Sequence, residues 1–183
     1  AIAERGAAYL VVSGGRTPQG LFLKLSQTDL DWSKVTITLA DDRFLPDTEA
    51  DSNERLVKAT LLQHQAAAAT FISLYAATAT AELAVPELLQ RVNKLPTFDA
   101  VILGMGEDGH TASLFPCCAE LAAGMADNAP VVLATSPTTD TWPNSHRDRG
   151  ASASVITACS RTMLIKDWRS ECASPRPRSD ANS

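Results

Sequence analysis

The segment GMGEDGHTASLFP (residues 104–116) directly follows FDAVIL (residues 98–103), an apolar run with the composition of a buried strand. It matches the dinucleotide-binding pattern G-x-G-x-x-G at Gly104, Gly106 and Gly109. A glycine-rich turn after a buried strand brings main-chain groups close to a ligand. The first question is therefore whether this ligand is a dinucleotide.

Two features argue against a dinucleotide. The pattern requires an unbroken helix after the third glycine and an acidic residue at the end of the next strand. Pro116 would interrupt such a helix after about two turns. The nearest suitably spaced acid, Asp127, precedes the next predicted strand, at residues 131–135. We therefore expect no NAD site.

The same turn carries groups suited to proton transfer. His110 titrates near neutral pH and can take a proton from water, and Asp108 can orient its imidazole or hold another substrate group. An isolated histidine is more often structural, but a glycine-rich loop at a strand end favours a catalytic role. His64, at a predicted helix end, and His146, in an atypical segment, have no such setting.

Strand and helix patterns alternate along the first 139 residues, which predicts an α/β fold with a mainly parallel sheet and helices on both faces. Ligands of such sheets bind beyond the carboxyl ends of the strands. Three strand ends carry unusual residues, at 13–17, 41–43 and 104–110, and we expect them to converge. The predicted strands are 8–13, 35–40, 98–103 and 131–135, and the predicted helices are 18–26, 53–63 and 81–92.

The first strand-end loop has features of an anion site. Thr17 is predicted as the N-cap of the next helix, with Pro18 at its first position. The two glycines allow main-chain N–H groups to point at an anion near the helix dipole. A tight turn with an exposed arginine is an equally good interpretation. The candidate substrate-binding residues here are Ser13, Gly14, Gly15, Arg16 and Thr17.

The second strand end reads Asp41-Asp42-Arg43. Arginine can bind a phosphate or carboxylate through two donors, and a neighbouring carboxylate can hold it in position. Taken alone, a surface ion pair is the better interpretation. We expect residues 51–53 to cap the following helix and not to contact a ligand.

The overall composition fits a single domain that acts on a small molecule. The chain has 183 residues and a formal charge of -5, which disfavours a nucleic-acid partner. Four cysteines without zinc-like spacing indicate reduced thiols and a cytoplasmic location. The alanine-rich, partly polar stretch at residues 65–81 is not expected to span a membrane.

Residues 140–183 differ from residues 1–139, which we take as the α/β domain. They contain only four residues of the types Leu, Ile, Val and Phe, and 7 basic and 5 acidic side chains. We expect this tail to be disordered or the product of a shifted reading frame, and not a binder of an acidic partner. Because the chain opens without methionine, we also expect its N-terminal sequence to be incomplete.

The three loops together resemble the 6-phosphogluconolactonase family over roughly residues 7–138. The resemblance rests on five stretches in the same order and spacing: LVVSGGRTP (10–18), DW (31–32), ADDR (40–43), DSN (51–53) and LGMGEDGHTASLFP (103–116). It implies an α/β fold shared with glucosamine-6-phosphate deaminases and ribose-5-phosphate isomerases. It also implies hydrolysis of 6-phospho-D-glucono-1,5-lactone without a metal or nucleotide.

The resemblance also implies roles for the candidate residues. His110 would activate water against the lactone carbonyl, while Arg43 and the 13–17 loop would hold the phosphate or stabilise charge on the opening ring. We further expect Asp41 and the three glycines of the histidine loop to contact the sugar phosphate. The expected partner is that small molecule alone, with the protein a cytoplasmic monomer.

Two departures from the family pattern stand out. Asp42 replaces the usual glutamate, so its shorter side chain is expected to loosen the site. The family's later arginine-containing segment, strand and G-x-x-K-like site are not found after Thr139, so we expect this chain to be poorly active. Deaminases carry an acid soon after the histidine, and its absence favours a lactonase. An inactive sugar-phosphate-binding remnant stays an alternative.

Overall fold

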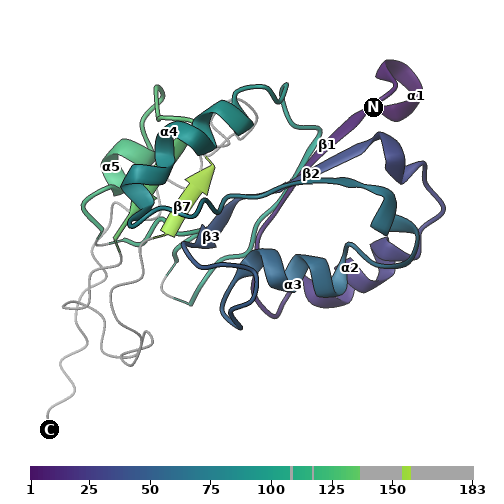
Figure 1. Cartoon of the computed structure of the whole chain (residues 1–183), viewed down its shortest axis with the longest axis horizontal. Coiled ribbons are helices and arrows are strands. Elements are labelled where there is room, and N and C mark those ends of the chain that lie inside the picture. The colour runs from purple at the N-terminus through teal and green to yellow at the C-terminus, as the bar shows by residue number, and fades with distance from the viewer. Residues whose placement is uncertain (108, 117, 137–153, 158–183) are drawn as a thin grey trace, which may run out of the picture.

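The computed structural model describes residues 1–107, 109–116, 118–136 and 154–157. It confirms the predicted α/β class, since four parallel strands form one sheet with helices packed around it (Figure 1). A second, smaller sheet of three strands lies beside it.

The parallel sheet has the order β4-β2-β1-β5. Its strands are rich in aliphatic and β-branched residues, which suit a sheet buried against helices. Strand β4 was not predicted, because three residues within an alanine-rich stretch give too short a pattern. The strands are β1 (Ala8–Val12), β2 (Val35–Leu39), β4 (Thr70–Ile72) and β5 (Ala100–Ile102).

The second sheet is antiparallel, with the order β3-β7-β6. It corrects three expectations. Strand β6 (Val132–Thr135) pairs here and not in the parallel sheet, and β3 (Asp41–Arg43) is a strand and not a loop. Strand β7 (Ser154–Thr157) lies between them, inside the predicted tail, where no strand was expected at these residues. The rest of residues 140–183 lies outside the described residues.

A single residue separates the two sheets along the chain. Ala40 follows β2 and still donates its N–H to the carbonyl of Val12 in β1, at 2.8 Å. The next three residues leave the parallel sheet and pair with β7. The predicted 35–40 strand is therefore one residue too long, since β2 ends at Leu39, and the chain forms a strand again from Asp41.

The predicted helices are present with small shifts at their ends. Helices α2 and α3 pack together, and α4 packs on β6 and β7 of the second sheet (Figure 1). No helix in the described ranges is both long and apolar enough to cross a bilayer. The helices are α1 (Ile2–Arg5), α2 (Gln19–Ser26), α3 (Asn53–Thr60), α4 (Ala81–Val92) and α5 (Leu121–Gly124), with 3-10 turns η1 (Trp32–Lys34) and η2 (His64–Ala68).

The predicted N-cap of α2 is wrong. Pro18 occupies the N-cap position and no side chain caps this helix. The N–H of Gln19, which a Thr17 cap would have bound, instead donates to the carbonyl of Arg16 at 3.3 Å. A turn thus precedes the helix and moves its start beyond Thr17.

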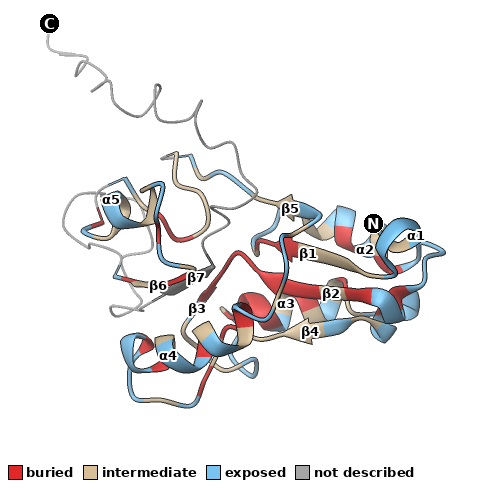
Figure 2. Cartoon of the chain, turned by 90° about the horizontal axis from the view of Figure 1, so that it is seen from above, coloured by how far each residue is buried: buried red, intermediate tan, exposed pale blue. Residues whose placement is uncertain are grey.

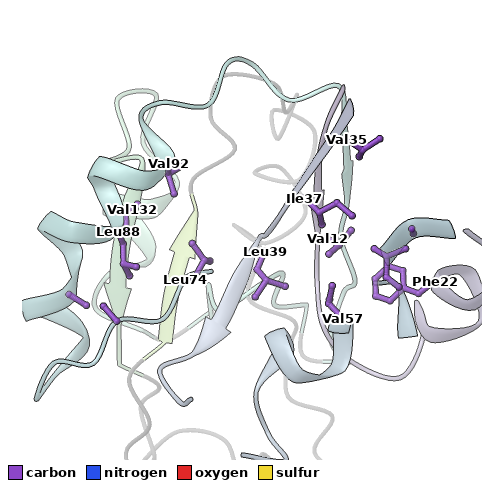
Figure 3. Close-up of a cluster of buried hydrophobic side chains, with 14 of the residues drawn as sticks. Val12, Phe22, Val35, Ile37, Leu39, Val57, Leu74, Leu88, Val92 and Val132 are labelled. Carbon is purple, nitrogen blue, oxygen red and sulfur yellow. The ribbon is translucent and has the colours of Figure 1, made fainter. Parts of the chain in front are cut away.

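Buried apolar side chains form one core that extends across both sheets (Figures 2 and 3). Val12, Ile37 and Phe22 lie between the parallel strands and α2 (Figure 3). Leu88 and Val132 extend the core to α4 and the second sheet. The shared core therefore holds the parallel sheet and the second sheet together.

Candidate active site

The three predicted loops begin side by side. Strands β2, β1 and β5 are neighbours in the parallel sheet. The N–H of Ser13, just after β1, donates to the carbonyl of Ile102 at 2.9 Å. Ala40 makes the matching bond to β1 on the other side. The expected convergence therefore starts from main-chain hydrogen bonds at adjacent strand ends.

The second strand end is held by the beginning of helix α3. The carboxylate of Asp42 is buried and accepts the N–H of Asn53 at 2.7 Å and that of Glu54 at 3.0 Å. The side chain of Asp42, although shorter than glutamate, thus still reaches the helix. This contact does not support the expectation that the shorter side chain loosens the site. Burial raises the pKa of Asp42 to about 7, although these two N–H groups oppose the shift.

Asn53 connects three successive residues of β3. Its side-chain nitrogen donates to the carbonyl of Asp41 at 2.9 Å. Its side-chain oxygen accepts from Nη1 of Arg43 at 3.1 Å, and the same Nη1 donates to the carbonyl of Asp51 at 2.8 Å. The exposed guanidinium of Arg43 is therefore oriented through one nitrogen.

The first loop lies against the same asparagine. A Cβ atom on Gly14 would come within 1.9 Å of Oδ1 of Asn53, so only glycine fits without movement. Among the described residues, the buried hydroxyl of Ser13 has no hydrogen-bond partner. Gly14 therefore packs against Asn53 at the start of α3, while Gly15, Arg16 and Thr17 are exposed.

The histidine loop closes on itself. The N–H of Gly106 donates to the carbonyl of His110 at 2.8 Å, and the N–H of Gly109 donates to that of Gly106 at 3.0 Å. Gly109 has a φ of 83°, which L side chains rarely adopt. Thr111 Oγ1 donates to the carbonyl of Gly104 at 3.1 Å. The residues after Gly109 form turns and not the long helix of a dinucleotide site.

A buried hydrogen bond joins this loop to β3. Ser113 Oγ donates to Oδ2 of Asp41 at 2.5 Å, across 72 residues of sequence. Burial raises the pKa of Asp41, opposed by this bond and by the charges of Arg43 and His110. The imidazole of His110 lies 4.6 Å from the Phe115 ring, centroid to centroid. Because the charges of His110 and Arg43 both oppose the rise in the pKa of Asp41, the three side chains are electrostatically coupled.

The sequence missed two residues that join the loops, Asn53 and Ser113. Both lie in stretches on which the family resemblance rests, but Asn53 was interpreted as part of a helix cap. Ser52, the other residue predicted to cap this helix, is confirmed as the cap, because its Oγ accepts the N–H of Arg55 at 3.2 Å. Asp108, a predicted partner of His110, lies outside the described residues.

Together these groups place a histidine, a buried acid and an arginine at the carboxyl ends of parallel strands. Within the described ranges, no group of three His, Cys, Asp or Glu side chains is arranged to hold a metal. The fold and site define an α/β protein whose candidate site lies at the carboxyl ends of its parallel strands. The chain belongs to the family "Glucosamine-6-phosphate isomerases/6-phosphogluconolactonase", whose model matches residues 1–164.

Relatives named 6-phosphogluconolactonase cover most of this chain. That of Rhizobium meliloti (strain 1021) is 54% identical over 117 residues, which are 63% of this chain and 50% of the relative. That of Neisseria meningitidis serogroup A is 45% identical over 144 residues, 76% of this chain and 62% of the relative. The chain thus spans only about half to three-fifths of these relatives.

Solved structures of 6-phosphogluconolactonases are similar to this chain in fold. The crystal structure of a 6-phosphogluconolactonase from Shewanella baltica OS155 superposes with a TM-score of 0.76 at 42% identity, over 86% of this chain and 63% of that one. The enzyme from Thermotoga maritima gives a TM-score of 0.65 at 28% identity, over 86% and 66%. The fold of the chain is that of these proteins.

Proposed function

We propose that this chain hydrolyses 6-phospho-D-glucono-1,5-lactone to 6-phosphogluconate, the second step of the oxidative pentose phosphate pathway. The observation that carries the proposal is the Ser113–Asp41 hydrogen bond, which joins the histidine loop to the strand that holds Arg43. Family membership and the names of the relatives support the same reaction.

The chemistry assigns a role to each group. His110 takes a proton from water, and the resulting hydroxide attacks the lactone carbonyl. The ring C–O bond then breaks, and its oxygen receives the proton that His110 took from water, which gives a free hydroxyl group and a carboxylic acid that ionises into solvent. Arg43 and residues 13–17 hold the phosphate, which supplies binding energy for orientation, or stabilise charge on the opening ring. Asp108 is proposed to orient the imidazole.

Lactone hydrolysis by the chain tests the proposal. The release of 6-phosphogluconate, coupled to NADP reduction by its dehydrogenase, should exceed the spontaneous rate. Even a turnover far below that of a longer relative is sufficient, because the reference is uncatalysed hydrolysis. A soluble, cooperatively folding chain that gives only the background rate would contradict the assignment.

Substitution of the histidine tests the mechanism. His110→Ala should lower kcat by about 10²–10⁴-fold with little change in KM, since a general base acts in the transition state. Arg43→Ala should raise KM as well, because it weakens phosphate binding. His64→Ala is the matched control, since His64 is exposed at the start of η2, and it should leave both constants unchanged. Normal turnover in His110→Ala would require another base.

A deaminase acting on glucosamine 6-phosphate is the main competing function within the family. The residues after the histidine, Ser113-Leu114-Phe115-Pro116, contain no acid, which favours the lactonase. Ammonia release from glucosamine 6-phosphate distinguishes the two, and we expect none.

A further inference from the structure

Asn53 makes more contacts than a helix start requires. It is buried, with 4% of its surface exposed, and its main-chain N–H already binds the carboxylate of Asp42. The cap itself is supplied by Ser52. The side-chain amide of Asn53 is therefore not needed to begin the helix.

The amide instead uses both of its ends within the site. Its oxygen accepts from Arg43 and its nitrogen donates to the Asp41 carbonyl. A side-chain amide is suited to this position because it carries an acceptor and donors on one plane. Aspartate would lose the donor and add a negative charge beside two buried carboxyl groups.

The amide also sets how closely the first loop approaches. The three nearest atoms to a Cβ on Gly14 would all belong to the Asn53 amide: Oδ1 at 1.9 Å, Cγ at 2.2 Å and Nδ2 at 2.8 Å. Gly14 is not among the glycines with positive φ. Glycine is thus required there by space, and the amide is what occupies that space.

We propose that Asn53 is a positioning residue, which fixes the guanidinium of Arg43 and the distance between the 13–17 loop and strand β3. Asn53 acts through these groups and does not itself touch the substrate. The kinetic consequence rests on the proposed function, whereas the structural coupling between Gly14 and Asn53 does not.

The structural coupling is tested by thermal unfolding of the full chain. Gly14→Ala should lower Tm in the wild type, and this loss should largely disappear in an Asn53→Ala background, which lacks all three clashing atoms. Gly15→Ala is the matched control, because its cost arises from a φ of 94° and should be the same in both backgrounds. An equal loss of Tm from Gly14→Ala in both backgrounds would overturn the coupling.

The positioning of Arg43 is tested by a double-mutant cycle. Asn53→Ala alone should raise KM for the lactone by about tenfold or more, the size expected for a hydrogen bond to a charged group. In an Arg43→Ala background it should change KM little, since the group it orients is gone. Additive effects on KM would indicate a merely structural role and overturn this part. Asn93→Ala, at the exposed end of α4, should leave KM unchanged.

Binding of 6-phosphogluconate, measured by calorimetry with the same variants, separates the two proposals. If the chain binds the product with the expected non-additive pattern but hydrolyses no lactone, the proposed function fails and the positioning role stands. If hydrolysis is present and the pattern is additive, the positioning of Arg43 by Asn53 fails and the function stands. If the chain neither binds the product nor hydrolyses the lactone, the positioning of Arg43 for this ligand fails together with the proposed function.

Discussion

The two sheets of this protein differ in the side chains they carry. The four parallel strands contain no Asp, Glu, Lys, Arg or His, whereas β3 of the antiparallel sheet consists of Asp41, Asp42 and Arg43. The parallel sheet is thus an apolar scaffold. The antiparallel sheet places charged groups beside it, and the burial of Asp41 and Asp42 is offset by hydrogen bonds to the histidine loop and to α3.

The largest expected difference between the sheets is in packing. Ile37 lies in β2, between two neighbouring strands, and is fully buried. Ile37→Ala should lower the free energy of unfolding by about 2–5 kcal/mol. Val132 lies on the edge strand β6 and is 3% exposed. Val132→Ala should cost less, on the order of 1.5 kcal/mol from the lost methyl groups. Urea unfolding that ranks the two in the opposite order would show that the second sheet is the more tightly packed.

This contrast also explains how much of the fold could be predicted. Strands β1, β2 and β5 are apolar runs next to helices, so their local pattern reveals them. Strands β3 and β7 form by pairing residues more than 100 positions apart. Such pairing leaves no local pattern, and Asp41-Asp42-Arg43 looks like a polar loop until its partner strand is known.

The same reasoning applies to the site. His110 and Arg43 could be proposed because they follow strands that end at one edge of a sheet. Asn53 and Ser113 could not, because their roles depend on tertiary contacts with Gly14, Asp41 and Arg43. Predicted contacts of Arg16 and Thr17 with the substrate stay predictions.

The second difference is in pH dependence. Because burial raises the pKa of Asp42 from 3.8 to about 7, its carboxyl group favours the folded state below pH 3.8 and this contribution is lost as pH rises through 7. One pKa unit corresponds to about 1.4 kcal/mol, so the free energy of unfolding falls by about 4 kcal/mol at most. The free energy of unfolding of the wild type, relative to Asp42→Asn, should therefore fall between pH 4 and about pH 7.

Asp47 is the matched control for this experiment. Its ion pair with Lys58 lowers the pKa of its carboxyl group, the opposite direction to Asp42. Relative to Asp47→Asn, the wild type should lose stability as pH falls through the lowered pKa. If Asp42→Asn gave the same direction as Asp47→Asn, the pKa of Asp42 would be lowered and not raised.

The third difference concerns main-chain pairing. Val155 lies in the central strand β7, opposite Asp42 in β3 and Ala134 in β6. Val155→Pro removes an N–H from this ladder and should cost about 1–3 kcal/mol through the unpaired carbonyl. Hydrogen exchange should quicken at Leu133 and Ala134.

The amides of β1 are the internal reference and should stay protected. Thr70→Pro is the control variant, because Thr70 begins the edge strand β4, a position where proline is tolerated. If Val155→Pro leaves exchange at β6 unchanged, the pairing of β7 with β6 does not contribute to the stability of the second sheet.

The smallest expected effect on stability comes from the N-terminal caps of α2 and α3, the helices that follow β1 and β3. Ser52 caps α3 through its Oγ, whereas α2 has no side-chain cap, although Thr17 was predicted to provide one. Ser52→Ala should lower the free energy of unfolding by about 1 kcal/mol. Part of this loss comes from the hydrogen bond of Ser52 to the Asp42 carboxylate, at 3.3 Å. Thr17→Ala should have almost no effect. Equal losses of unfolding free energy in urea would mean that Thr17 does cap α2 in solution. The helices after β1 and β3 would then begin with equally stabilising caps.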